Sequence, residues 1–269
     1  MITVREIDFC GGCRERGKMR FVGLDLAWVE GNPSGVAVLD GDCNAVALAA
    51  TPNIHYGLAS LVAAVGSPND TIVAIDGPLV VGNSTGRRPC EQLVSQRYGR
   101  HGASCHSTNL TLYPDPIGVR LVRRLHDCGY LHYGARPIGL PGVVMEVYPH
   151  PAIVTLFDLP GIIRYKKGSV ADKRAGLAIF RMRIAELVGA SPSLRQTPAL
   201  ARFLSIPLNE LRGRAIKEYE DGLDAIFCAY LAAFYWCWQS QRAEALGSVE
   251  AGYIVVPTHT ANGLRWPLT

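Results

Sequence analysis

Acidic residues interrupt three of the most apolar segments of this chain. Asp25 lies in the segment FVGLDLAW, Asp76 lies in TIVAIDGPL, and Asp221 and Asp224 open the segment DGLDAIFCAYLAAFYW. An unpaired carboxylate in an apolar core is strongly destabilising, so such groups are usually paired, hydrogen-bonded or bound to a metal. Convergence of these four on one point predicts a Mg²⁺ or Mn²⁺ site, which favours metal-assisted hydrolysis of phosphoesters.

The order of the apolar segments predicts an α/β fold. Strands at 21–28, 35–40 and 45–51, joined by tight turns, predict an antiparallel meander. A helix at 55–65 then precedes a fourth strand at 71–79, whose continuous apolar run is typical of a strand buried on both faces and parallel to a neighbour. The later segments predict a helix from near Pro89, a helix at 117–129, a strand at 143–153, two or three helices to about residue 215, a long buried helix from Asp221 to Gln239 and a strand at 252–257.

This order is that of the RNase H-like fold, a mixed five-stranded sheet with helices on both faces. The stretch at about 82–142, rich in glycine, proline and arginine, predicts an inserted helical and loop region. We expect an N-terminal tail at 1–19, a single domain at 20–258 and a C-terminal tail at 259–269.

In such a sheet the first and fourth strands are neighbours, roughly 4.8 Å apart, so Asp25 and Asp76 are expected to share a cation. Asp221 and Asp224 are three residues apart on one helix and should lie on one face. A helix N-terminus at the strand ends would favour their negative charge. For Asp221 a helix-capping role is an equally good interpretation, because aspartate is a preferred cap.

Charge and cysteine content indicate the kind of partner and the cellular compartment to expect. The net charge is +4, and seven arginines lie between Gly77 and His126 against two acids, which suits a phosphate-bearing partner or, alternatively, a solvated surface. Eight dispersed cysteines and the lack of an evident signal peptide predict a cytoplasmic protein. The longest apolar run, 225–238, is too short to cross a bilayer. The Cys10–Cys13 pair has the spacing of a zinc or redox motif, but no second pair follows.

Six motifs in this order carry a resemblance to a known family: GLDLAW, AIDGPL, RRPCE, MEVYPHPA, DGLDAIFCAYLAA and GYIVVP. Over roughly residues 20–257 the chain resembles domain-of-unknown-function family 429, described as predicted nucleases with an RNase H fold. The wider superfamily includes ribonucleases H and Holliday-junction resolvases. It uses one carboxylate on the first strand, one on or near the fourth, and one or two on the C-terminal helix. The resemblance implies that Asp25 takes the first role, Asp76 the second, and Asp221 or Asp224 the third.

Each candidate residue has an alternative role. Asp25 would bridge two metal ions or make a turn hydrogen bond, and Asp76 would be a ligand or cap its Asp-Gly-Pro turn. Glu146 departs from the superfamily pattern and is either a catalytic ligand or the partner of a buried arginine or hydroxyl. The candidates for substrate binding, each also readable as an ordinary surface or loop residue, are Arg87, Arg88, Glu91, Arg97, His150 and Lys166, with His101, His106 and Lys167 beside them.

The leading hypothesis is a metal-dependent nuclease that hydrolyses phosphodiester bonds by a two-metal carboxylate mechanism. The alternatives are a small-molecule or nucleotide phosphohydrolase that uses the same site, and a non-catalytic binding protein. The expected partner is nucleic acid or another phosphate-bearing substrate, without a membrane, and a homodimer is left open. The sequence does not distinguish DNA from RNA, or endonuclease from exonuclease activity.

Overall fold

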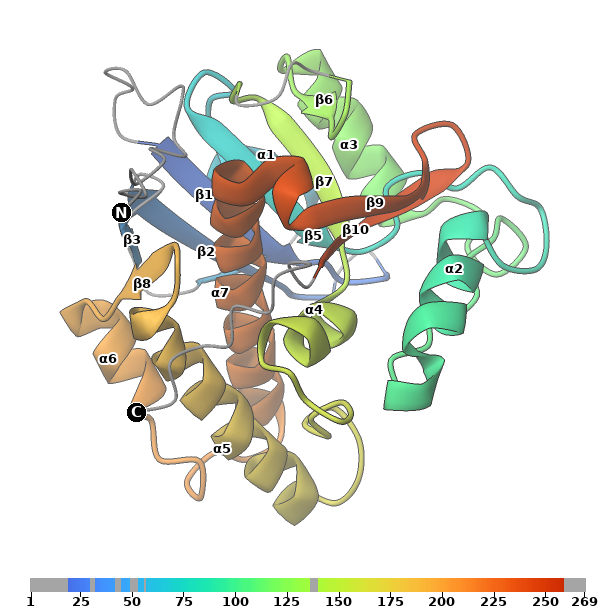
Figure 1. Ribbon diagram of the computed structural model, residues 1–269. Helices are drawn as coiled ribbons and strands as arrows, with labels where there is room; N and C mark the ends of the chain where they lie inside the picture. The colour runs from blue at the N-terminus through green and yellow to red at the C-terminus, as the bar shows by residue number, and fades with distance from the viewer. Residues whose placement is uncertain are drawn as a thin grey trace, which may run out of the picture.

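The computed structural model describes residues 19–29, 32–41, 45–48, 53–55, 57–135 and 140–258 of the 269-residue chain. The expected tails, with the Cys10–Cys13 pair, lie outside the described residues except for Met19. The described parts form a mixed α/β structure in which helices pack on both faces of a twisted sheet (Figure 1).

Ten strands in the described residues form one sheet, in the order β8–β3–β2–β1–β5–β7–β10–β9, with β4 beside β2 and β6 beside β7. Their bounds are β1 Met19–Asp25, β2 Ser34–Gly41, β3 Ala45–Leu48, β4 Asn53–His55, β5 Thr71–Asp76, β6 Leu131–His132, β7 Val143–Val147, β8 Ser193–Arg195, β9 Ala243–Ser248 and β10 Gly252–Pro257. The prediction of a five-stranded sheet was therefore wrong. β4, β6 and β8 are too short to show an alternating pattern, and β9, with the sequence AEALGS, has no regular alternation of apolar and polar residues.

The helices are α1 Leu58–Val65, α2 Pro89–Tyr98, α3 Ile117–Asp127, α4 Pro149–Leu156, α5 Val170–Glu186, α6 Pro198–Leu204 and α7 Arg214–Trp238. Helices α1 and α3 pack on one face of the sheet, whereas α7 crosses the other face with α4, α5 and α6 around it (Figure 1). Helix α2 packs on the β9–β10 hairpin. The inserted stretch thus contributes α2, α3, β6 and their loops.

Strand alternation assigns each side chain of the central sheet to one of these layers. In β1, Phe21 packs in the α7 layer, while Val22 and Leu24 pack with α1 and α3. In β5, Ile72 packs in the α7 layer in the same way. Residues of even and odd number on these strands therefore face different layers, which decides where each carboxylate points.

Two elements differ from their predicted bounds in ways that affect the site. The long helix begins at Arg214, two turns before Asp221, and Gly213 is its N-cap. Asp221 is therefore inside the helix, so the prediction that it caps the helix or benefits from the helix N-terminus was wrong. The predicted strand 143–153 ends at Val147 and helix α4 follows, because Pro149 fits the first position of a helix, where no N–H is needed.

Candidate functional site

Asp25 and Asp76 end two neighbouring parallel strands. Asp25 is the last residue of β1, Asp76 is the last residue of β5, and the two are directly opposite in the register of the strands. Residues opposite each other in a sheet share a face. Both carboxylates therefore lie at the same sheet edge and on the side covered by α7, as the sequence predicts.

Helix α7 reaches this edge because glycines let it touch the sheet backbone. A Cβ atom on Gly23 would lie 2.1 Å from the carbonyl oxygen of Ala225 and from the amide nitrogen of Ala229. A Cβ atom on Gly35, the partner of Asp25 on β2, would lie 2.3 Å from the carbonyl oxygen of Asp221. Only glycine permits so close an approach. The approach places the acidic part of α7 beside Asp25.

Asp224 is fully buried, and both of its carboxylate oxygens face polar partners. The hydroxyl of Tyr165 donates to Oδ1 at 2.7 Å, and Nζ of Lys166 lies 3.0 Å from Oδ2. The same Nζ lies 3.8 Å from a carboxylate oxygen of Asp76. Lys166 thus joins an acid of the sheet to an acid of the helix.

Asp221 has a second lysine. Lys217, one helical turn earlier, pairs with Asp221 and lies 3.1 Å from Glu220. The carboxyl of Asp25 lies within hydrogen-bonding reach of Asp221. The Oδ2 atom of Asp221 is nevertheless buried without a hydrogen-bond partner in the described part of the chain. This orphaned oxygen is suited to a cation.

Burial and mutual repulsion raise the pKa of three carboxyls. Burial raises the pKa of Asp76 to about 8, with Lys166 acting in the opposite direction and Asp25 adding to the rise. Burial and the neighbouring Asp25 raise the pKa of Asp221 to about 8. Burial also raises the pKa of Asp224, but only to about 6, because Lys166 opposes the rise. Burial, aided by repulsion from the neighbouring acids, is thus enough to keep protons on Asp76 and Asp221 near neutral pH.

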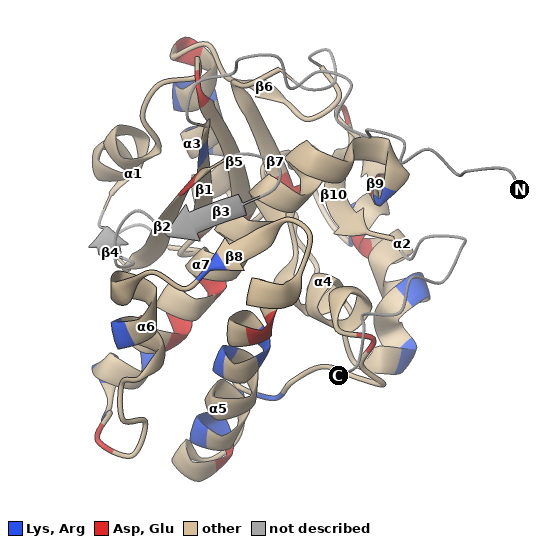
Figure 2. Cartoon of the chain, turned by 60° about the vertical axis from the view of Figure 1, so that its left-hand side comes forward, with Lys and Arg blue, Asp and Glu red and all other residues tan. Residues whose placement is uncertain are grey.

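Asp25, Asp76 and Asp221 line an open cleft of about 1720 Å³, whereas Asp224 is buried behind it. The lining of the cleft includes the loop around residues 99–106 after α2 and residues 161–168 with the start of α5, and these two segments are joined by the hydrogen bond from the N–H of Ile162 to the carbonyl oxygen of His101. Figure 2 shows acidic positions along α7 and basic ones on the neighbouring α5. The basic and histidine side chains that line the cleft are Arg87, Arg100, His101, His106, His150, Arg164, Lys166, Lys167 and Lys217. Six of the nine are among the candidates that the sequence suggests for substrate binding, namely Arg87, His101, His106, His150, Lys166 and Lys167.

His150 lies in the first turn of α4, with its ring 5.5 Å from that of Tyr165. Burial lowers the pKa of His150 to about 3, and Lys166 and Lys167 lower it further in the same direction. This histidine is therefore neutral at physiological pH. Its Nδ1 atom is buried without a hydrogen-bond partner in the described chain.

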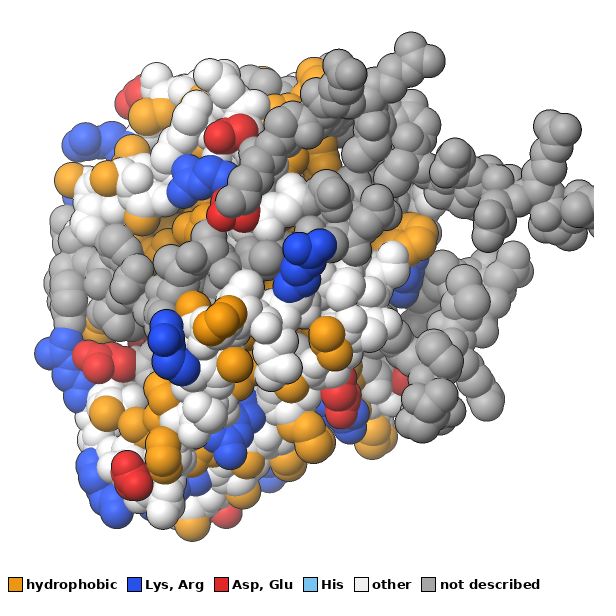
Figure 3. All heavy atoms as spheres, turned by 90° about the vertical axis from the view of Figure 1, so that its left-hand side faces the viewer, with side chains coloured by type: hydrophobic (Ala, Val, Ile, Leu, Met, Phe, Trp, Pro, Cys, Tyr) orange, Lys and Arg blue, Asp and Glu red, His pale blue; other side chains and the backbone are white. Residues whose placement is uncertain are grey.

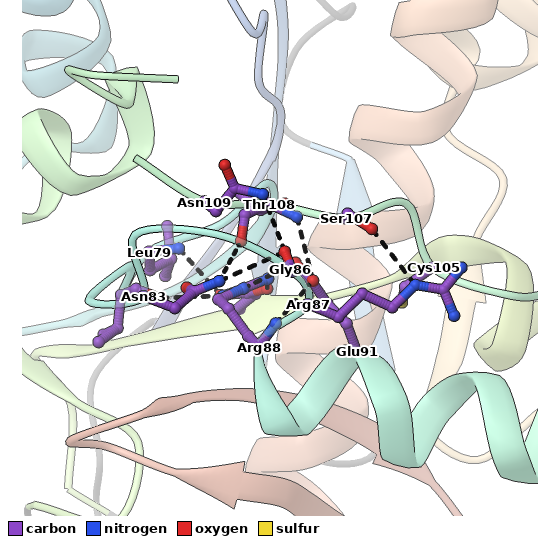
Figure 4. Close-up of polar contacts among 12 residues, drawn as sticks. Leu79, Asn83, Gly86, Arg87, Arg88, Glu91, Cys105, Ser107, Thr108 and Asn109 are labelled. Carbon is purple, nitrogen blue, oxygen red and sulfur yellow. Dashed lines mark hydrogen bonds and ion pairs between the residues drawn. The ribbon is translucent and has the colours of Figure 1, made fainter. Parts of the chain in front are cut away.

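Three predicted site residues form a separate buried network on the other face of the sheet. Glu146 is next to Val147 on β7 and points away from α7, since Met145 and Val147 pack in the α7 layer. The guanidinium of Arg88 pairs with Glu146 at 2.6 and 2.9 Å and with Glu91 at 2.8 Å. Each of the three is at most 3% exposed. Figure 4 shows Arg88 and Glu91 at the start of α2, among the loops of the insert.

Backbone groups complete this network. The N–H of Leu79 donates to Glu146 at 2.9 Å, and the N–H of Thr108 donates to Glu91 at 3.1 Å. Among the described residues that line the cleft, neither Arg88 nor either of its glutamates appears. The geometry is that of the alternative interpretation of Glu146, the partner of a buried arginine. Arg97 also lies apart from the cleft and pairs with Glu244 on β9.

The sequence gives no role to Tyr165, Lys217 or Trp28, although all three lie at the site. Lys217 could have been found, because it precedes Asp221 by four residues on one helix. Trp28 is 43% exposed at the cleft, and its ring lies 4.9 Å from that of Tyr113 in the insert. Tyr165 gives no sequence signal, since its contact with Asp224 depends on the tertiary fold.

The carboxylate donors fit a hard divalent cation, and the orphaned Oδ2 of Asp221 points to one. Within the described residues, however, no group of three or more His, Cys, Asp or Glu side chains is arranged to hold a metal ion. Lysine ammonium groups compensate part of the negative charge instead. A cation would therefore have to draw Asp25, Asp76 and Asp221 closer together.

Fold and site together define a mixed α/β protein. It has an acidic cluster at the ends of two parallel strands, beside a cleft lined with basic side chains. Residues 23–245 match the family described as "Protein of unknown function (DUF429)", and the chain belongs to this family. The searches of curated proteins and of solved structures give no match. No helix among the described residues is long and apolar enough to cross a membrane.

Proposed function

We propose that this protein is a metal-dependent hydrolase of phosphodiester bonds, with nucleic acid as its substrate. The observation that supports this most is the parallel register that sets Asp25 against Asp76, with Asp221 and Asp224 brought over them by α7. Four carboxyls at one point, with the pKa values of Asp76, Asp221 and Asp224 raised, are a costly arrangement that a structural role does not need.

The strand order supports the RNase H-like part of the proposal. The central strands run β3–β2–β1–β5–β7, with β1 and β2 antiparallel and β1, β5 and β7 parallel. This is the order expected for that fold from the meander and the alternating helices. In open α/β sheets, sites form at the carboxyl ends of parallel strands, where Asp25 and Asp76 lie.

Asp25, Asp76 and Asp221 are the residues that would hold the cation. Bound Mg²⁺ or Mn²⁺ supplies positive charge that stabilises the negative charge developing on the phosphoryl group. In the net reaction the oxygen of water forms a bond to phosphorus, the bond from phosphorus to one ester oxygen breaks, and one proton of the water ends on the released alcohol. The chain supplies orientation, through ammonium and guanidinium groups along the cleft.

The location of the positively charged side chains supports binding of a nucleic-acid strand in the cleft. Positive side chains line it from two parts of the sequence, including Arg87 and Arg100 from the insert and Arg164 and Lys167 from the segment before α5. In contrast, the coloured part of the face in Figure 3 carries acidic, basic and hydrophobic side chains in a scattered arrangement. The cleft, and not that face, is suited to a phosphate backbone.

The proposal is tested by cleavage of end-labelled single- and double-stranded DNA and RNA in millimolar Mg²⁺ or Mn²⁺. We expect cleavage that needs the metal and falls at least a hundredfold in Asp76→Asn. The matched control is Asp127→Asn, an exposed acid at the end of α3 on the opposite face of the sheet, which should leave cleavage unchanged. Cleavage of nucleotides or small phosphoesters alone would favour a small-molecule phosphohydrolase, and no turnover of any substrate would favour a binding protein.

A further inference from the structure

We infer that Lys166 takes the place of one cation, so that the site binds one divalent ion and not two. The inference rests on the proposed function and specifies how the metal is held. Its basis is the position of the ammonium group between the sheet and the helix. Nζ of Lys166 lies 3.0 Å from Asp224 and 3.8 Å from Asp76, so it bridges two acids as a metal ion would.

The bridging position is fixed by the packing of the preceding residues. The ring of Tyr165 is fully buried and stacks on Phe180 of α5, with ring centres 4.7 Å apart. A Cβ atom on Gly176 of α5 would lie 2.3 Å from the carbonyl oxygen of Arg164 and 2.7 Å from Cα of Tyr165. The segment before Lys166 thus lies directly on the α5 backbone, and its side chain enters the cluster from a rigid base.

Asp224 is already engaged by this arrangement. Its Oδ1 atom accepts from the Tyr165 hydroxyl, and its Oδ2 atom, which has no hydrogen-bond partner in the described chain, lies 3.0 Å from the Lys166 ammonium group, which therefore occupies the position of a second metal ion. Asp25, Asp76 and Asp221 remain, and Oδ2 of Asp221 is likewise buried without a hydrogen-bond partner. Three carboxylates and water molecules are enough for one Mg²⁺, which keeps several waters and few protein ligands.

The charges at the site accommodate one divalent ion. With that ion bound and all four carboxyls ionised, the acids carry four formal negative charges; Lys166 compensates one, and Lys217 is shared between Asp221 and Glu220. One divalent ion compensates two more, and the ammonium group of Lys166 already lies between Asp76 and Asp224. Lys166 is also 28% exposed toward the cleft, so its charge remains available to a substrate phosphate.

The experiment is a calorimetric titration of the full chain with Mn²⁺, together with the electron paramagnetic resonance spectrum of the loaded protein. We expect one Mn²⁺ per chain in the unmodified protein and two in Lys166→Met, which keeps the aliphatic chain and removes the charge. Only the variant should show the spin coupling of two Mn²⁺ ions roughly 4 Å apart. Lys167→Met is the matched control, because Lys167 lines the same cleft without pairing with Asp76 or Asp224, and it should bind one ion.

The outcomes separate this inference from the proposed function. Two ions in the unmodified protein, or one ion in both proteins, would overturn the inference and leave a metal-dependent site in place. No Mn²⁺ binding in the unmodified protein would overturn the inference, and its absence from Lys166→Met as well would remove the metal from the proposed function. Lys166→Gln, with circular dichroism to verify folding, replaces the methionine variant if that one does not fold.

Discussion

At the scale of single residues, the carboxylates on the two faces of the sheet lie in different surroundings. Asp76 faces the cleft among other acids, whereas Glu146 faces the opposite layer and is bound by Arg88 at both oxygens; burial raises the pKa of both. On the paired strands β5 and β7, Glu146 lies opposite Ile75, which is one position before Asp76. That shift alone turns one side chain toward the site and the other toward a structural ion pair.

The buried network predicts a large loss of stability when Arg88 is removed. Arg88→Met leaves Glu91 and Glu146 buried without their counter-charge, so we expect about 3–5 kcal/mol of destabilisation by urea unfolding. Arg97→Met removes an exposed ion pair with Glu244 and should change the free energy of unfolding by at most about 1 kcal/mol. Equal losses of unfolding free energy in the two variants would mean that the network around Glu146 stabilises the fold no more than an exposed ion pair does.

His132 predicts a pH dependence that is independent of the site. It is buried on β6, with its Nδ1 atom 3.0 Å from the hydroxyl of Tyr253, and burial, aided by His126, lowers its pKa to about 4. The unfolded chain gains this proton below about pH 6.5 and the folded chain only near pH 4. The free energy of unfolding should therefore fall as the pH is lowered between these values, by up to about 1.4 kcal/mol per pH unit from this group.

The measurement is urea unfolding at several pH values in the unmodified protein and in His132→Gln. The variant should lose stability at all pH values but show a shallower slope between pH 4 and 6.5. Parallel curves for the two proteins would assign the acid sensitivity to other groups.

At the scale of elements, the contact between α7 and β1 decides whether the acids meet. Gly23→Ala would force a methyl group against the backbone of α7, and overpacking of this kind costs about 1–3 kcal/mol or more. We expect a lower melting temperature and at least tenfold weaker Mn²⁺ binding, because the helix carries Asp221 and Asp224 away from Asp25. Gly189→Ala, where a Cβ atom would meet open space, is the control and should change neither. Unchanged Mn²⁺ affinity in Gly23→Ala would disconnect the helix position from the site.

Element patterns also show how far the sequence predicts this structure. The apolar runs around Asp25 and Asp76 predict neighbouring, parallel strands. The long apolar run after Asp224 predicts α7, but not its start at Arg214, because the first two turns of the helix are polar. Strand alternation could also have shown that Glu146 faces away. The contacts of Lys166 and Tyr165 could not be predicted, because residues 161–168 have no periodic pattern and reach the acids only through packing on α5.

At the scale of the whole molecule, Asp25, Asp76 and Asp221 line one cleft together with nine basic and histidine side chains of the described chain. If a nucleic-acid strand occupies the cleft, the logarithm of its affinity should fall linearly with the logarithm of salt concentration, by about 0.7 for each phosphate contacted in a single strand. Lys167→Met should lower this slope by about one contact, as measured by fluorescence anisotropy in the inactive Asp76→Asn background. Binding that is independent of salt would exclude a phosphate backbone as the ligand.

The account depends on Asp25 and Asp76 sharing one cation at the ends of their parallel strands. The most direct measurement is the anomalous difference density of crystals soaked in Mn²⁺. We predict a single strong peak in contact with the carboxylates of Asp25 and Asp76 and next to Asp221. Crystals saturated with Mn²⁺ that show no peak at these residues, with Lys166 still between Asp76 and Asp224, would contradict it.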